Sequence, residues 1–166
     1  CGTVVSAMRL ANGLEVTKIR VPIGRILVVY EARPNVTVDV AALCLKASSV
    51  ALLRGSASAA RTNQALVGVM HDALRRVGIT TDAIIVGDGD RDRLAALVAD
   101  PDYADVVIPR GGENLKAFLT EHARIPMLAA GGGNCHVYID QSADVAMAER
   151  IIVNAKTHRP SVCNAA

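Results

Sequence analysis

The chain of 166 residues contains 51% hydrophobic and 20% charged residues, which is typical of one globular domain with a substantial core. Aromatic residues make up only 2%, so the core must consist of Val, Leu, Ile and Ala, and stacking platforms for single-stranded nucleic acid are scarce. The formal net charge of +2 is spread without a basic block, and no run of about 18 apolar residues occurs, which argues against nucleic-acid binding and membrane-spanning functions.

Short apolar runs alternate with longer segments of helical periodicity along most of the chain. The clearest helical pattern covers 58–77, where apolar residues recur at three- and four-residue spacing and Gly78 follows. The first twenty residues are less regular and are expected to form an arm. In chain order, the expected elements are a strand at 25–30, a helix at 36–47, a strand at 49–53, a helix at 58–77, a strand at 83–86, a helix from Asp90 to Val98, a strand at 105–108, a helix ending near His122, strands at 125–130 and in the segment CHVYID, and a helix over 143–156 capped by Ser142.

This alternation of strands and helices predicts an α/β fold. We expect a three-layer, Rossmann-like parallel sheet with helices on both faces and right-handed crossovers. The sequence contains no internal repeat and no linker.

Four loops that follow predicted strands combine Gly or Pro with a cation or an amide. They cover 31–35, 54–58, 87–90 and 109–114. Parallel sheets bind ligands outside the carboxyl ends of their strands, and helix N-termini there offer free N–H groups to phosphate. The four loops therefore favour a phosphate-bearing ligand.

The usual dinucleotide fingerprint G-x-G-x-x-G is absent. Gly87 and Gly89 begin in the same way, but Arg91 and Asp92 follow. A dinucleotide would therefore bind by a variant scheme. Arg54, directly after a predicted strand, could meet the 2′-phosphate of NADP, although on residue type alone a solvated arginine is the more common interpretation.

The four cysteines lie far apart in a chain too large and apolar to need disulfides, so we expect reduced thiols and a cytoplasmic location. Cys44 lies on the apolar face of a predicted helix, and Cys135 is expected to pack beside a Gly-rich turn. From residue type alone, Cys163 is more often structural than catalytic. Cys135, His136, His158 and Cys163 could be offered as zinc ligands, but their spacing does not match paired ligand motifs, and no metal site is predicted.

Segments 21–66, 105–115, 132–140 and 154–165, which include YEARPNVT, PRGG, GNCHVYID and RPSVCNA, together resemble the gamma-glutamyl phosphate reductase family. These are the glutamate-5-semialdehyde dehydrogenases of proline biosynthesis, a branch of the aldehyde dehydrogenase superfamily. The resemblance runs from about Asn12 to the end of the chain. It implies the superfamily's five-stranded variant of the Rossmann fold, which does not use the usual glycine fingerprint.

The resemblance also implies roles for individual residues. Cys163 stands where the family has its catalytic thiol, and Asn35 stands where the superfamily has an oxyanion-hole amide. The cationic neighbours Lys156, His158 and Arg159 would favour the Cys163 thiolate. The positions expected to bind the cofactor are Arg54, Gly55, Ser56, Gly87, Gly89, Gly111 and Gly112. Candidates for the anionic ends of the substrate are Arg33, Arg110 and Arg159.

The implied reaction is reduction of L-glutamyl 5-phosphate to L-glutamate 5-semialdehyde with NADPH and release of phosphate, through a thioacyl-enzyme. Hydrolytic aldehyde dehydrogenases have a Glu where this chain has Ala129, and its loss fits a reductase, although some reductases keep the Glu. The family resemblance further implies a homo-oligomer and association with glutamate 5-kinase.

The resemblance and the absence of an initial Met suggest that the chain is part of a longer protein, with little or no turnover by itself. The implied organisation is an arm at 1–20, an NADP-binding domain at 21–150 and the start of a catalytic domain at 151–166. Apart from the indication that Arg54 gives, the sequence does not decide between NADPH and NADH as the cofactor. The alternatives are another aldehyde or acyl dehydrogenase, or a non-catalytic nucleotide-binding module.

Overall fold

The computed structural model describes residues 1–87, 90–131 and 135–158, and it divides the chain into two compact units, Cys1–Ala129 and Ala130–Ala166. Cys163, Arg159 and Gly89 lie outside the described residues. Within the described part of the chain, no helix is long and apolar enough to cross a membrane.

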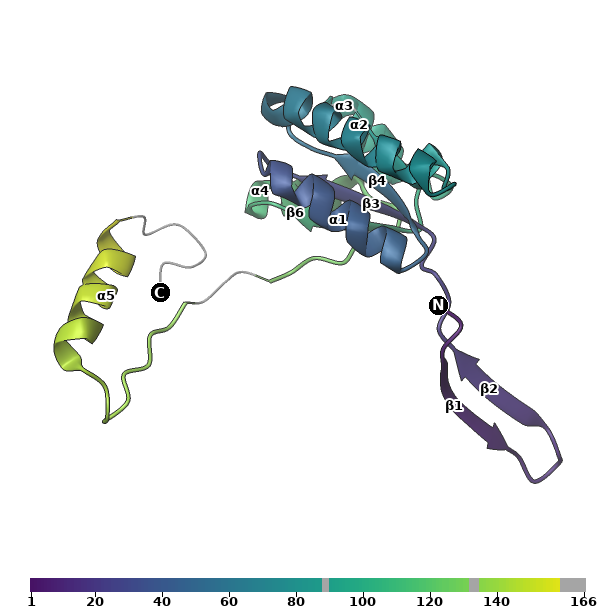
Figure 1. Cartoon of the computed structure of the whole chain (residues 1–166), viewed down its shortest axis with the longest axis horizontal. Coiled ribbons are helices and arrows are strands. Elements are labelled where there is room, and N and C mark those ends of the chain that lie inside the picture. The colour runs from purple at the N-terminus through teal and green to yellow at the C-terminus, as the bar shows by residue number, and fades with distance from the viewer. Residues whose placement is uncertain (88–89, 132–134, 159–166) are drawn as a thin grey trace. The chain divides into compact units, whose positions relative to one another are not determined.

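A four-stranded sheet forms the centre of the first unit (Figure 1). Its strands β3 (Arg25–Tyr30), β4 (Val50–Arg54), β5 (Ile84–Val86) and β6 (Val106–Arg110) all run parallel in the order β5-β4-β3-β6. These strands are almost continuous apolar runs because both faces of a parallel sheet are buried. The fold class and these four strands are therefore confirmed.

The strand expected at 125–130 is only partly correct. Met127 forms a single parallel bridge to Val107, with the Val107 amide donating to Pro126 O (2.9 Å) and the Leu128 amide donating to Val107 O (3.0 Å). Proline has no N–H to donate to a ladder, which limits regular pairing at this edge.

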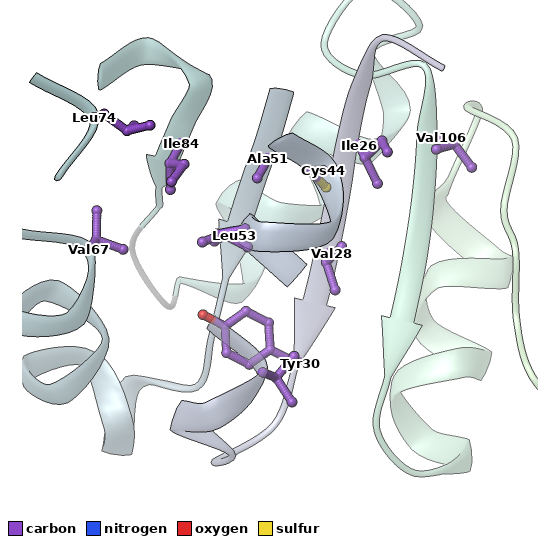
Figure 2. Close-up of a cluster of buried hydrophobic side chains, with 12 residues drawn as sticks. Ile26, Val28, Tyr30, Cys44, Ala51, Leu53, Val67, Leu74, Ile84 and Val106 are labelled. Carbon is purple, nitrogen blue, oxygen red and sulfur yellow. The ribbon is translucent and has the colours of Figure 1, made fainter. Parts of the chain in front are cut away.

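Helices cover both faces of the sheet as predicted. On one face, α1 (Pro34–Lys46) and α2 (Ala60–Arg76) pack on the cluster that contains Ile26, Val28 and Tyr30 (Figure 2). On the other face, α3 (Arg91–Ala99) and α4 (Glu113–His122) pack on the cluster that contains Leu27 and Val29. Successive residues of β3 thus point into opposite layers, as the two-residue period of a strand requires. Short 3₁₀ turns, Ala57–Ala59 and Thr81–Ala83, precede α2 and β5.

The first twenty residues, expected to be an arm, form a two-stranded hairpin whose pairing register shifts between Val4 and Ser6. Strands β1 (Val4–Arg9) and β2 (Glu15–Ile19) pair antiparallel (Figure 1), and Gly13 in the connecting turn has a φ of 87°. Every residue of both strands is exposed. Because neither face of the hairpin is buried, its strands do not need, and do not show, the apolar–polar alternation that marks a strand with one buried face.

Two expectations for the second unit are wrong. The segment CHVYID forms no strand in its described residues 135–140, and the unit contains no described strand with which it could pair. The last helix, α5 (Val145–Thr157), is capped by Asp144, whose Oδ1 accepts from the Met147 amide at 3.0 Å. Ser142 instead donates its hydroxyl to Asp140 Oδ1 at 2.7 Å in the preceding turn. By contrast, Asp90 caps α3 as expected, accepting from the Asp92 amide at 3.1 Å.

An ion pair joins β3 and β6 at the amino edge of the sheet. Asp105 accepts from the Arg25 backbone amide at 2.6 Å and lies 3.2 Å from the Arg25 guanidinium. These side-chain and backbone hydrogen bonds from Arg25 lower the pKa of Asp105 below its usual value of 3.8. Gly24 (φ 113°) makes room for this pair, because a Cβ atom there would overlap the Asp105 carboxylate. The pair therefore fixes the register of the two strands at the edge opposite the loops.

The lowered pKa predicts a pH-dependent contribution to stability. The carboxylate of Asp105 stabilises the fold above about pH 4, and this contribution disappears as the pH falls through the depressed folded-state pKa. Asp105→Asn should therefore lower the melting temperature at pH 5–8, and the difference from the wild type should shrink as the pH falls below about 4. Asp72→Asn, which removes an exposed ion pair with Arg75, is the control and should have little effect at any pH. A gap for Asp105→Asn that persists unchanged in acid would contradict this account.

Candidate functional site

The carboxyl ends of the four parallel strands lie at one edge of the sheet, which brings the four predicted loops together. The register aligns Val29 with Arg54, Tyr30 with Arg110 and Leu53 with Val86. Strands β4 and β5 extend from β3 on one side and β6 lies on the other, so chain order reverses between β3 and β6. Ligands of parallel α/β sheets bind at this kind of edge.

A hollow of about 320 Å³ opens at this edge between the loops after β3 and β4 and the start of α4. Its polar wall contains a guanidinium, a hydroxyl, an amide and a carboxylate. The lining residues are Tyr30, Glu31, Arg54, Ser56, Ala57, Leu94, Asn114 and Leu115. It therefore combines an apolar floor with several polar groups, as ligand sites usually do.

A second hollow of about 260 Å³ lies between α3 and the ends of β4 and β5. It includes Gly87 and Asp90 from the third predicted loop. Arg54 and Leu94 line both hollows. The half-buried Arg54 therefore borders both spaces, and two predicted cofactor residues, Ser56 and Gly87, border one hollow each.

Gly55 has a packing role that the sequence did not reveal. The residue is buried, and a Cβ atom there would overlap the Asn63 amide nitrogen and approach the Tyr30 ring to 3.1 Å. The glycine is thus required by the close approach of the β4 turn to β3 and α2. Gly87 is different, because a Cβ atom there would meet only Leu53 O at 3.9 Å.

A carboxylate occupies the start of α4, where sequence reasoning expected free amides for phosphate. Glu31 Oε1 accepts from the Gly112 amide at 3.0 Å. A Cβ atom at Gly111 would lie 2.8 Å from the Glu31 carboxyl carbon and 2.8 Å from Leu115. Glu31 thus supplies the cap that Gly112 lacks, and Gly111 lets it approach. The sequence shows only a glutamate after β3 and two glycines after β6, and no local pattern connects residues 81 positions apart.

The predicted catalytic amide lies in the first turn of α1. Asn35 is exposed and donates its Nδ2 to Asp39 Oδ2 at 3.2 Å. Since an amide nitrogen carries two protons, one donor direction remains for another acceptor. Arg33, the N-cap residue of α1, and Arg110, at the end of β6, are exposed at the same edge. The structure therefore brings Asn35, Arg33 and Arg110 to the edge with Arg54, whereas Cys163 and Arg159 are not placed.

A buried chain of hydrogen bonds lies beneath this edge and was not predicted. Tyr30 at the end of β3, Thr37 in α1 and Asn63 in α2 are at most 2% exposed. Thr37 Oγ1 lies 2.8 Å from the Tyr30 hydroxyl and donates to Asn63 Oδ1 at 3.0 Å. Burial raises the pKa of Tyr30, and the hydrogen bond to Thr37 opposes part of this rise. The phenol is therefore protonated and can donate to Thr37.

The described cysteines and histidines form no metal centre. Cys1 is exposed, Cys135 is half-buried and Cys44 is buried, and this burial raises the pKa of Cys44, as for a core thiol. In the part of the chain that the structure describes, no group of three or more His, Cys, Asp or Glu residues could hold a metal ion.

Several known proteins are similar to this chain in fold and in sequence, although no family model matches the chain. The crystal structure of an acetylating aldehyde dehydrogenase from Geobacillus thermoglucosidasius superimposes with a TM-score of 0.71 at 26% identity, over 94% of this chain and 35% of that one. The chain thus has a fold of the aldehyde dehydrogenase class.

The similarity to one family is much closer. The gamma-glutamyl phosphate reductase of Caldicellulosiruptor saccharolyticus is 50% identical over 166 residues, which is 99% of this chain and 40% of the relative. The crystal structure of the same enzyme from Thermotoga maritima has a TM-score of 0.82 at 40% identity, over 99% of this chain and 40% of that one. The chain is therefore homologous along its whole length to gamma-glutamyl phosphate reductases, and it spans about 40% of the length of the relatives it matches.

The Glu31 cap yields a test of charge at the start of α4. Glu31→Gln keeps an acceptor oxygen but removes the negative charge next to the positive end of the helix, which should destabilise the fold by about 0.5 kcal/mol at low salt. Glu121→Gln makes the same change near the other end of α4 and should be neutral or slightly stabilising. Thermal unfolding of the two variants measures the difference, and equal effects would contradict the capping role.

Proposed function

We propose that the chain is the nucleotide-binding part of an NADPH-dependent oxidoreductase of proline biosynthesis that reduces L-glutamyl 5-phosphate to L-glutamate 5-semialdehyde. The observation that carries the proposal is the 50% identity to a gamma-glutamyl phosphate reductase over the whole chain. The edge geometry supports it, because the predicted cofactor cation, Arg54, borders two hollows at the carboxyl ends of the strands.

The residues at this edge suit a phosphorylated dinucleotide. Arg54 offers a guanidinium for the 2′-phosphate, and Ser56 and Asn114 offer hydroxyl and amide groups in the same hollow. Leu94 supplies apolar surface shared by both hollows. The Glu31 carboxylate at the start of α4 disfavours phosphate at that helix end, so the pyrophosphate is expected nearer the Gly87 loop. When bound, NADPH supplies a hydride.

The chemistry begins at Cys163. Its thiolate attacks the acyl carbon of the substrate, a C–S bond forms, and the bond to the phosphate oxygen breaks with release of phosphate. Reduction of the resulting thioester by hydride then breaks the C–S bond, which gives the aldehyde and restores the thiolate. Lys156 and His158, which precede Cys163 closely in the sequence, provide positive charge that favours the thiolate. Asn35 and the Cys163 amide donate to the oxyanion that forms in each step.

The substrate carries a phosphate and an α-carboxylate, and arginines suit both groups. Arg33 and Arg110 are exposed at the edge near Asn35, and Arg159 precedes Cys163 in the sequence. In this proposal, residues 21–150 form the dinucleotide-binding domain and 151–166 begin the catalytic domain. Homo-oligomerisation, association with glutamate 5-kinase and a cytoplasmic location belong to the same proposal.

The nucleophile is tested by substitution in the full-length gene product that includes this chain. Cys163→Ser should reduce phosphate-dependent NADP reduction by glutamate semialdehyde by more than about 1000-fold, because a hydroxyl replaces the activated thiol. Cys44→Ala and Cys135→Ala remove two other thiols of this chain and should retain activity. Full activity of Cys163→Ser would overturn the mechanism, and an inactive wild type would overturn the proposed reaction.

The cofactor assignment is tested at Arg54. Arg54→Gln should raise the KM for NADPH about 10- to 100-fold, since it removes a charged partner of the 2′-phosphate, and should change the KM for NADH much less. Arg76→Gln, at an exposed position at the end of α2, is the matched control and should change neither value. Equal effects of Arg54→Gln on the two cofactors would contradict a role in binding the 2′-phosphate.

A further inference from the structure

The first turn of α1 carries Asn35 but has no ordinary cap. The N-cap residue is Arg33, whose side chain makes no capping hydrogen bond, and Pro34 follows at the first helical position. The side chain of Asn35 itself is exposed and bonds only within α1, to Asp39, among its described contacts. Some other group must therefore hold this turn in place if Asn35 is to meet a reacting atom.

Thr37 is the residue that anchors the turn. It lies two residues after Asn35, about 3 Å along the helix axis, and is fully buried. Its single hydroxyl proton goes to Asn63 Oδ1, so its lone pairs are left to accept from the Tyr30 hydroxyl. The hydroxyl thus ties α1 to β3 on one side and to α2 on the other.

The Tyr30–Thr37–Asn63 hydrogen-bond network also reaches the hollow at the carboxyl edge of the sheet. Tyr30 lines the hollow of about 320 Å³, and Asn63 packs so closely over Gly55 that no side chain fits at that position. Gly55 lies between Arg54 and Ser56, which both line this hollow. Three side chains on three elements therefore connect the turn that would hold the nucleotide to the turn that carries the oxyanion donor.

Because Tyr30, Thr37 and Asn63 are all buried, the geometry of their hydrogen-bond network is well defined. Buried polar groups that lose a partner are costly, so the three side chains cannot rotate independently. A hydrogen bond at each of two links leaves little freedom for α1 to shift along the sheet edge. A displacement of about 1 Å in such a group can cost about 100-fold in rate.

We propose that Thr37, through Tyr30 and Asn63, is a positioning residue that fixes Asn35 relative to the nucleotide-binding turn at Gly55. Thr37 touches neither substrate nor cofactor, and it acts only by holding α1. The inference rests on the proposed function, because it assigns Asn35 the role of oxyanion donor. It predicts that Thr37 controls kcat more than cofactor binding.

The test uses Thr37→Val and Thr37→Ser in the full-length gene product. Thr37→Val keeps the shape but removes the hydroxyl and should lower kcat about 10- to 100-fold, with less than about a threefold change in the KM for NADPH. Thr37→Ser keeps the hydroxyl and should retain most of the wild-type kcat. Tyr30→Phe, which removes only the outer link, should give a smaller loss and serves if Thr37→Val does not fold.

Two controls separate positioning from stability. Cys44→Ala removes buried volume near the far end of α1 and should lower the melting temperature without changing kcat. Thr62→Val makes the same chemical change at an exposed position beside Asn63 and should change neither quantity.

The outcomes separate the inference from the function it rests on. If wild type is active but Thr37→Val keeps full kcat, or if Thr37→Ser fails to recover activity, the positioning role is wrong while the proposed reaction stands. If Thr37→Val raises the KM for NADPH as strongly as it lowers kcat, the hydrogen-bond network supports only the nucleotide-binding turn, and the inference is overturned. An inactive wild type overturns the proposed function and the inference with it.

Discussion

The parallel pairing of β3 with β4 on one side and β6 on the other is the constraint on which the rest of the structure depends. This pairing aligns the end of β3 with Arg54 and Arg110, and the Arg25–Asp105 pair fixes the register at the opposite edge. Because all four strands run in one direction, every loop after a strand opens at the same edge. This arrangement is the reason that the two hollows, the starts of the helices and Asn35 all lie at one edge of the sheet.

Packing and function use the same glycines for different reasons. From the family resemblance, Gly55, Gly111 and Gly112 were expected to bind the cofactor. The structure shows that Gly55 is required by Asn63 and Tyr30, and that Gly111 makes room for Glu31. The glycines therefore build the walls of the edge, whereas the polar groups that face the hollows are side chains such as Arg54, Ser56 and Asn114.

The sheet and its helices were predictable because local patterns and burial agree. The run 25–30 is apolar on both faces, as a central parallel strand must be, and Asp90 is an ordinary helix cap. The hairpin was not predictable, since its residues are exposed and show no alternation. Nor was the second unit, where CHVYID has strand-forming residues but no described partner strand.

The site was predictable only as a set of loops. Arg54 and the glycines stand out in the sequence because they follow predicted strands, whereas the role of Asn35 was implied only by the family resemblance. The structure brings Arg54 and Asn35 to one edge. The Glu31 cap and the Tyr30–Thr37–Asn63 chain depend on contacts between residues 7 to 81 positions apart. No local pattern encodes such contacts, so only the folded arrangement reveals them.

The central claim is that the carboxyl edge of this sheet holds the dinucleotide. Hydrogen–deuterium exchange of the full-length gene product, with and without NADPH, tests it most directly. We expect NADPH to slow exchange in peptides covering 53–60 and 110–116, and to leave the hairpin at 4–19 unchanged. Protection confined to other segments, with exchange at this edge unaltered under saturating NADPH, would contradict the account.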